Sequence, residues 1–284
     1  MSTTDFAHKM SPDDLISLMK ARKEMEDIGI AMKTLNKVGG SIETGLKRIP
    51  SKQQQWLQSK VNETLLILVK SNLATMQKGN LFKKPSSATY KALVTSTGAL
   101  SGAFGSATGI GTAIFTSELI ISTKFIMRSI LDIARSEGED LYDPETQMAC
   151  LQVFALGGDS KDDDGLETSY YTSRYIMDNA VKNATSYISK NGIKSLNKLL
   201  AGSSNPLLKL ISSIASRFTV QVSEKFIAQA IPLIGAAGGG SINFMFINHF
   251  QKMARAHFTI RRLERKYGKD LVKQKYLKIE ARPK

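Results

Sequence analysis

The chain has 284 residues, of which 42% are hydrophobic, and its mean hydropathy of −0.15 is typical of a globular protein rather than of a polytopic membrane protein. Its single cysteine, Cys150, excludes an internal disulfide and a cysteine-rich zinc site. The formal net charge is +14, and residues 251–284 carry twelve Lys/Arg against three Asp/Glu. This surplus of positive charge can attract polyanions such as nucleic acid or anionic lipid, or it can serve as a solubilising surface.

The first 80 residues are predicted to be helical. The start of the chain has no basic region followed by an apolar one, so we expect no secretory signal and a cytoplasmic location. The run SPDD at 11–14 supplies a Ser N-cap, a Pro and two acids, which predict a helix to about residue 35. A second helix is predicted from Ser51, with Trp56, Val61, Leu65 and Leu68 on one face.

The polar segment 77–90 is predicted to be the main linker, because it contains Gly and Pro and lies between two periodic segments. It divides the chain into an N-terminal helical extension, 1–80, and a helical domain, 81–284, with a basic C-terminal region.

A glycine-rich segment, GALSGAFGSATGIGTAIF at 98–115, follows the linker. The uncharged window 92–117 is long enough to cross a bilayer, but only seven of its 26 residues are large and apolar. No phosphate-binding glycine motif is present. Gly98, Gly102, Gly105 and Gly109 form one helical stripe, which predicts close packing against a second helix. The candidate partner is 231–258, which contains Gly239; a soluble bundle is favoured over a hairpin that dips into lipid.

The remaining segments also predict helices. One continues through Ala134, another begins at Pro144, and others cover about 170–190, 206–230 and 236–266. The loop GGDSKDDDG at 157–165 has the carboxylates but not the spacing of a calcium loop. The sequence therefore predicts an all-α, multi-helix bundle built around a glycine-rich, closely packed central helix pair.

Few polar residues suggest chemistry. Glu118, Asn243 and His257 are the candidates for a catalytic polar centre, and Glu118, His249 and His257 are the candidates for metal ligands. Neither set has the spacing of a known motif, and core histidines explain the pattern better. We therefore expect no cofactor. Cys150 lies in an apolar helical context and is expected to be inert packing.

A basic stripe is predicted on the helix through 255–266, formed by Gln251, Arg255, Arg262 and Lys266. Arg255, Arg262 and Lys266 are the predicted contacts to a membrane or partner. The stripe lacks the interleaved aromatic residues that stack on bases, so nucleic acid is not expected. No small-molecule ligand is indicated.

Several blocks resemble the bacterial EcsC family. They are SELIISTKFIMRSILDIARSEGEDLYDPETQMACLQVFALGG, then YYTSRY, then SRFTVQVSEKFIAQAIPLIGAAGGGSINFMFINHFQKMARAHFTIRRLERKYG. The resemblance covers about residues 90 to 276 and leaves out the first 80. It implies a helical, largely bacterial protein without a defined biochemical activity. The family takes its name from a member encoded beside the subunits of an ABC transporter.

The leading hypothesis is a non-enzymatic cytoplasmic protein that associates peripherally with the inner membrane. It would contact either the anionic surface of that membrane or an ABC-transporter-type membrane complex. A metal-dependent hydrolase centred on Glu118, Asn243 and His257 and a membrane-inserting effector are the alternatives.

Overall fold

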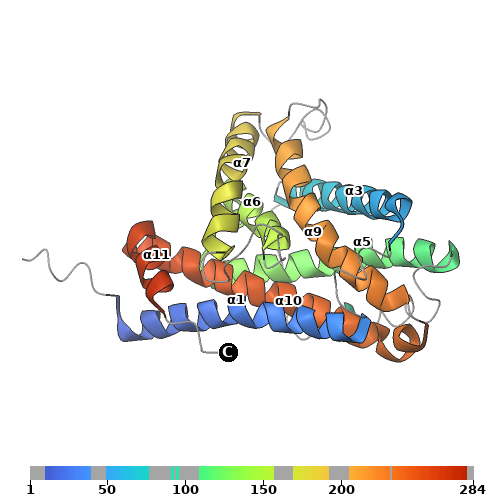
Figure 1. The fold of residues 1–284 in the computed structure, drawn as a ribbon. Helices are drawn as coiled ribbons and strands as arrows, with labels where there is room; N and C mark the ends of the chain where they lie inside the picture. Colours follow the sequence, from blue (N-terminus) through green and yellow to red (C-terminus); the bar gives the residue numbers. More distant parts are fainter. Residues whose placement is uncertain are drawn as a thin grey trace, which may run out of the picture.

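The computed structural model describes residues 10–39, 49–76, 91–92, 94–95, 109–156, 169–191, 205–230 and 232–279. The described residues form helices and no strand, so the predicted all-α bundle is confirmed (Figure 1). The helices are α1 (Pro12–Gly39), α3 (Ser51–Met76), α5 (Gly109–Ser136), α6 (Pro144–Gln152), α7 (Ser169–Asn191), α9 (Pro206–Ala230), α10 (Pro232–Tyr267) and α11 (Lys269–Lys278), with the 3-10 turn η2 (Val153–Ala155) after α6.

The predicted helix starts follow from local capping. The Ser11 hydroxyl accepts a hydrogen bond from the backbone N–H of Asp14 at 3.3 Å, so Ser11 caps α1. Asp143 caps α6 in the same way, because its carboxylate accepts from the backbone N–H of Glu145 at 3.1 Å and Pro144 occupies the first turn. These side chains satisfy N–H groups that lack partners within the helix.

The longest helix, α10, is the central element of the bundle. α1 lies along it for much of its length, and α5 and α9 pack against it as well (Figure 1). α3 and α7 pack mainly against α9. α10 ends at Tyr267 because Gly268 takes a positive φ of 86°, a conformation that favours glycine, and the chain then turns into α11. The sequence did not predict α11 as a separate helix.

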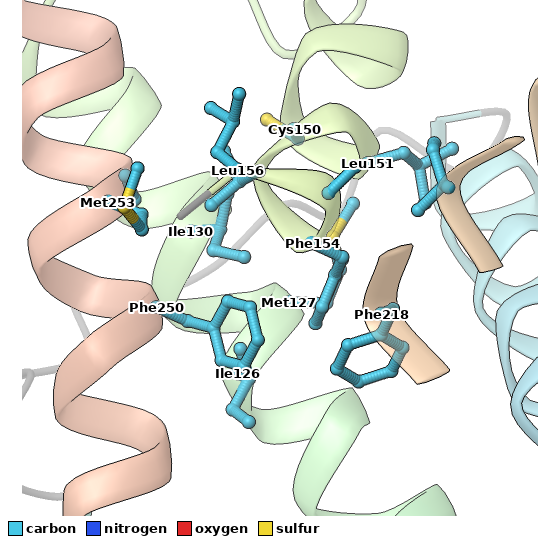
Figure 2. Packing of buried hydrophobic residues seen from close by; sticks show 14 of the residues in the cluster. Ile126, Met127, Ile130, Cys150, Leu151, Phe154, Leu156, Phe218, Phe250 and Met253 are labelled. Carbon is cyan, nitrogen blue, oxygen red and sulfur yellow. The ribbon is translucent and has the colours of Figure 1, made fainter. Parts of the chain in front are cut away.

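Aromatic rings fill the core between α5, α9 and α10. The ring of Phe154 lies 5.0 Å from that of Phe218 and 5.2 Å from that of Phe250, measured between centroids. Figure 2 shows these rings packed beside Ile126 and other side chains of α5. Cys150 is fully buried in the same cluster, and burial raises the pKa of its thiol, which agrees with the prediction of an inert cysteine.

The glycine stripe falls mainly outside the described residues, as do the predicted linker 77–90 and the loop 157–165. Gly98, Gly102 and Gly105 are not described, and only the backbone is described at Gly109, in α5, and at Gly239, in α10. The predicted close-packed pair therefore stays a prediction.

A neighbouring glycine of α10 does make a close approach. A Cβ atom at Gly240 would lie 3.2 Å from the Thr95 side chain and 3.4 Å from the Thr95 carbonyl oxygen. Three residues later the Asn243 amide donates to the Val94 carbonyl at 2.7 Å. α10 is thus in tight contact with the segment that precedes the glycine-rich stretch. None of the described helices is both long and apolar enough to cross a membrane.

Candidate functional site

The bundle buries an ion pair between α5 and α9. The Lys225 ammonium lies 2.5 Å from a Glu118 carboxylate oxygen, and the two side chains are 0% and 2% exposed. The same ammonium lies 4.8 Å from the centroid of the Phe246 ring on α10. Each buried ion loses several kcal/mol of hydration, and the partner charge and the ring face offset part of that loss. The sequence analysis predicted Glu118 as a member of a polar centre, but it did not predict Lys225 as its partner.

Aromatic side chains surround this pair. The Phe115 ring, one turn before Glu118, lies 5.1 Å from the Phe226 ring and 6.4 Å from the Trp56 ring, measured between centroids. Phe115 and Phe226 are buried, and they lie next to Glu118 and Lys225 on their own helices. The ion pair is therefore held in an apolar layer of the core.

The predicted polar centre of Glu118, Asn243 and His257 is not formed. Asn243 and His257 both lie on the continuous helix α10, fourteen residues apart, which corresponds to about 21 Å along the axis. Asn243 contacts the backbone at Val94, and His257 lies in a different polar network. Asn243 and His257 therefore cannot reach one common centre while α10 is continuous.

His257 belongs to a buried network between α7 and α10. Its Nδ1 atom lies 3.0 Å from the Tyr170 hydroxyl, and Arg174 donates to the same hydroxyl oxygen at 3.3 Å. Arg174 also binds Glu264 with two hydrogen bonds of 2.8 and 2.7 Å. Burial, with the nearby Arg174 and Arg261 charges, lowers the pKa of His257. Hence His257 is neutral and links α10 to α7.

His249, the third metal candidate, is buried in α10. It is 1% exposed, and within the described part of the chain neither ring nitrogen has a hydrogen-bond partner. Burial, with a smaller effect from the Lys252 charge, lowers its pKa to about 3. Among the residues that the structure describes, no three His, Cys, Asp or Glu side chains converge on a point that could hold a metal ion. Glu118, His249 and His257 therefore do not form a metal site there.

The neutral His249 makes stability depend on pH. In the unfolded chain it titrates near 6.5, while in the folded protein it stays neutral down to about pH 3. Its contribution is complete above pH 6.5 and falls by about 1.4 kcal/mol per pH unit below it. In urea unfolding, the free energy of unfolding of the wild type should therefore fall between pH 7.5 and pH 5 by about 2 kcal/mol more than that of the His249→Leu variant. A difference between the two proteins that does not change with pH would contradict this assignment.

The predicted basic stripe on α10 is largely paired with acids. Arg262 and Lys266 bind the Asp14 carboxylate at 3.2 and 2.7 Å, and Arg255 lies 3.4 Å from Glu24. Hydrogen bonds from Lys266 and Tyr267 hold the pKa of Asp14 well below its ordinary value. Gln251, the fourth member of the stripe, is buried and donates to the Ser129 hydroxyl at 2.8 Å. These interactions fasten α10 to α1 and α5.

A second set of basic residues faces solvent. It lies on the first three turns of α1 and on α11, which meet where Arg22 donates to the Tyr276 carbonyl at 2.6 Å. We call this region, residues 12–23 with 269–278, the basic end. Its lysines form no ion pair with any acid that the structure describes. The exposed members are Lys20, Lys23, Lys269, Lys273 and Lys278.

A family model supplies the affiliation of the chain. Residues 12–263 match the model described as the EcsC protein family. The chain belongs to the EcsC family. The match begins at the first residue of α1, so the EcsC region includes α1 and α3, which the sequence resemblance had left out. Comparisons with curated proteins and with solved structures give no match.

The described polar groups of the EcsC chain differ in their access to solvent. Glu118, Lys225, His249 and His257 are enclosed by protein. The lysines of the basic end face solvent, so they can contact a partner in this arrangement.

Proposed function

We propose that this EcsC protein is a non-enzymatic peripheral protein of the cytoplasmic membrane, and that the basic end binds the anionic lipid surface. The observation that carries the proposal is the contrast, among the described residues, between the paired cations of α10 and the unpaired lysines of the basic end. Cations of α10 are neutralised by acids of α1 and of the segment after α5, for example Lys266 by Asp14 and Arg261 by Glu139. The exposed lysines of the basic end have no such partner among the described residues.

Unneutralised lysines near one surface favour anionic lipid, because each contributes about 1 kcal/mol of attraction near a negatively charged leaflet. Aromatic side chains that could stack on bases are not interleaved with the lysines of α11, whose one aromatic residue, Tyr276, is buried. The charge pattern therefore favours a lipid surface over nucleic acid.

Vesicle co-sedimentation tests the proposal. The purified full chain should bind vesicles of phosphatidylglycerol and phosphatidylcholine but not vesicles of phosphatidylcholine alone. Replacing Lys269, Lys273 and Lys278 with serine should weaken binding about a hundredfold, because three attractive charges are removed. Raising the salt from 0.1 M to 1 M should also weaken binding, because the Debye length falls from about 10 Å to about 3 Å.

A matched variant separates position from net charge. Lys52 and Lys70 on α3 and Lys190 on α7 are also exposed and form no ion pair with a described acid, so replacing these three with serine removes the same charge elsewhere. This control should bind nearly as well as the wild type. Equal losses in both triple variants, or a wild type that leaves the anionic vesicles unbound at low salt, would refute the proposal.

A further inference from the structure

The outward face of α1 carries two large apolar side chains that are exposed to solvent. Ile16 and Met19 are 62% and 49% exposed, although α1 is otherwise packed along α10. At 100° per residue, Ile16, Met19, Lys20 and Lys23 fall within an arc of about 100°. The opposite face of the same turns is buried and includes Leu18, Ala21 and Arg22.

This combination has the pattern of a helix that lies at a lipid surface. An interfacial helix presents apolar side chains to the acyl boundary and lysines to the headgroups on either side. In α1 the two exposed apolar residues are followed on the same face by Lys20 and Lys23, which have no acid partner within the described residues. Single exposed apolar residues need no explanation, but two on adjacent turns beside unpaired lysines form a coherent surface.

α11 extends this surface. Arg22, on the inner face of α1, donates to the Tyr276 carbonyl and lies over the Tyr276 ring at 5.4 Å from its centroid. Next to Tyr276 in the chain, Leu277 is 43% exposed. In Figure 1 α11 lies at the same end of the molecule as the start of α1. The apolar residues thus lie within the basic end rather than apart from it.

We infer that Ile16 and Met19 insert into the lipid surface when the basic end binds it, so that α1 lies in the membrane interface with its buried face still on α10. This inference rests on the proposed function and adds an apolar contribution to the free energy of membrane binding. The occupant of the face is an anionic bilayer, since its charge complements the lysines that follow the two apolar side chains on the same face.

A fluorescent label distinguishes insertion from surface attraction. Cys150 is fully buried, so a thiol-reactive probe such as NBD reacts selectively with a cysteine introduced on the surface. Met19→Cys places the probe at the proposed insertion site. Ser189→Cys places it on the exposed far end of α7, which projects away from α1 (Figure 1). On phosphatidylglycerol vesicles the probe at position 19 should shift to the blue and brighten, whereas the probe at 189 should not.

A double variant tests the apolar contribution independently. Ile16→Ser with Met19→Ser should lower binding at high salt at least about tenfold, because charge attraction is screened there and apolar burial remains. Its thermal unfolding should match that of the wild type, because both side chains face solvent.

The outcomes separate the two proposals. A wild type that does not sediment with anionic vesicles overturns both of them. A wild type that sediments while the probe at position 19 stays in water overturns the insertion alone, and so does an equal blue shift at both labelled positions.

Discussion

Replacing Lys225 with methionine is expected to lower the free energy of unfolding by about 3–5 kcal/mol, because the Glu118 carboxylate would remain buried without the Lys225 ammonium. The two groups lie 2.5 Å apart and are almost completely enclosed. Urea unfolding followed by circular dichroism measures the change. This loss is a large share of the stability of an ordinary domain.

Two matched variants make the Lys225 prediction specific. Lys60 forms a surface pair with Glu63 and is partly exposed, so Lys60→Met should cost less than about 1 kcal/mol. Replacing Glu118 with leucine in the Lys225→Met background removes the stranded charge and should recover most of the lost stability. A single Lys225→Met variant within about 1 kcal/mol of the wild type, or a double variant less stable than the single, would contradict this account.

Phe250→Ala is expected to cost about 3–5 kcal/mol, because it removes a fully buried ring and leaves a cavity. The ring packs against three other phenyl rings, with centroids 5.2 Å from Phe154, 5.6 Å from Phe218 and 5.1 Å from Phe246. The substitution therefore weakens contacts of α10 with both α9 and η2 (Figure 2). Thermal and urea unfolding should both report the loss.

The control for Phe250 lies on the same helix. Phe244 is 45% exposed and contacts Lys91, whose ammonium lies 5.1 Å from the ring centroid. Phe244→Ala should cost less than about 1 kcal/mol, the worth of a surface cation–π contact. Similar losses at the two positions would show that burial does not govern the stability of α10.

The sequence predicted the helices well because their signals are local. Ser11 marks a helix start through capping and Pro144 through its fixed backbone angle, and the structure begins helices at or beside each of them. Gly268 was harder to interpret, since only its positive φ separates α10 from α11. The basic stripe was recognised as a pattern, but its acid partners on α1 lie more than two hundred residues away in the chain.

The buried polar groups were the least predictable part. Glu118 and Lys225 are 107 residues apart in sequence, and no spacing rule connects two helices across a bundle. His249 and His257 share α10, yet one has no hydrogen-bond partner in the described chain and the other meets Tyr170. Periodicity predicts that a residue faces the core, but not which side chain of another helix it meets there.

Asp14 also determines when α1 can complete its contacts. Its cationic and phenolic partners are Arg262, Lys266 and Tyr267, and the last of these lies 253 residues further along the chain. At roughly 5–20 residues per second, a ribosome adds that length in roughly 13–50 s. Until α10 is made, no α10 covers the Leu18 face of α1, and this apolar face can make competing hydrophobic contacts. Docking of α1 onto α10 is therefore a late event of synthesis. Nascent chains that end before residue 262 lack all three partners, and the ion-paired junction of α1 with α10 forms only after nearly the whole helical region has been made.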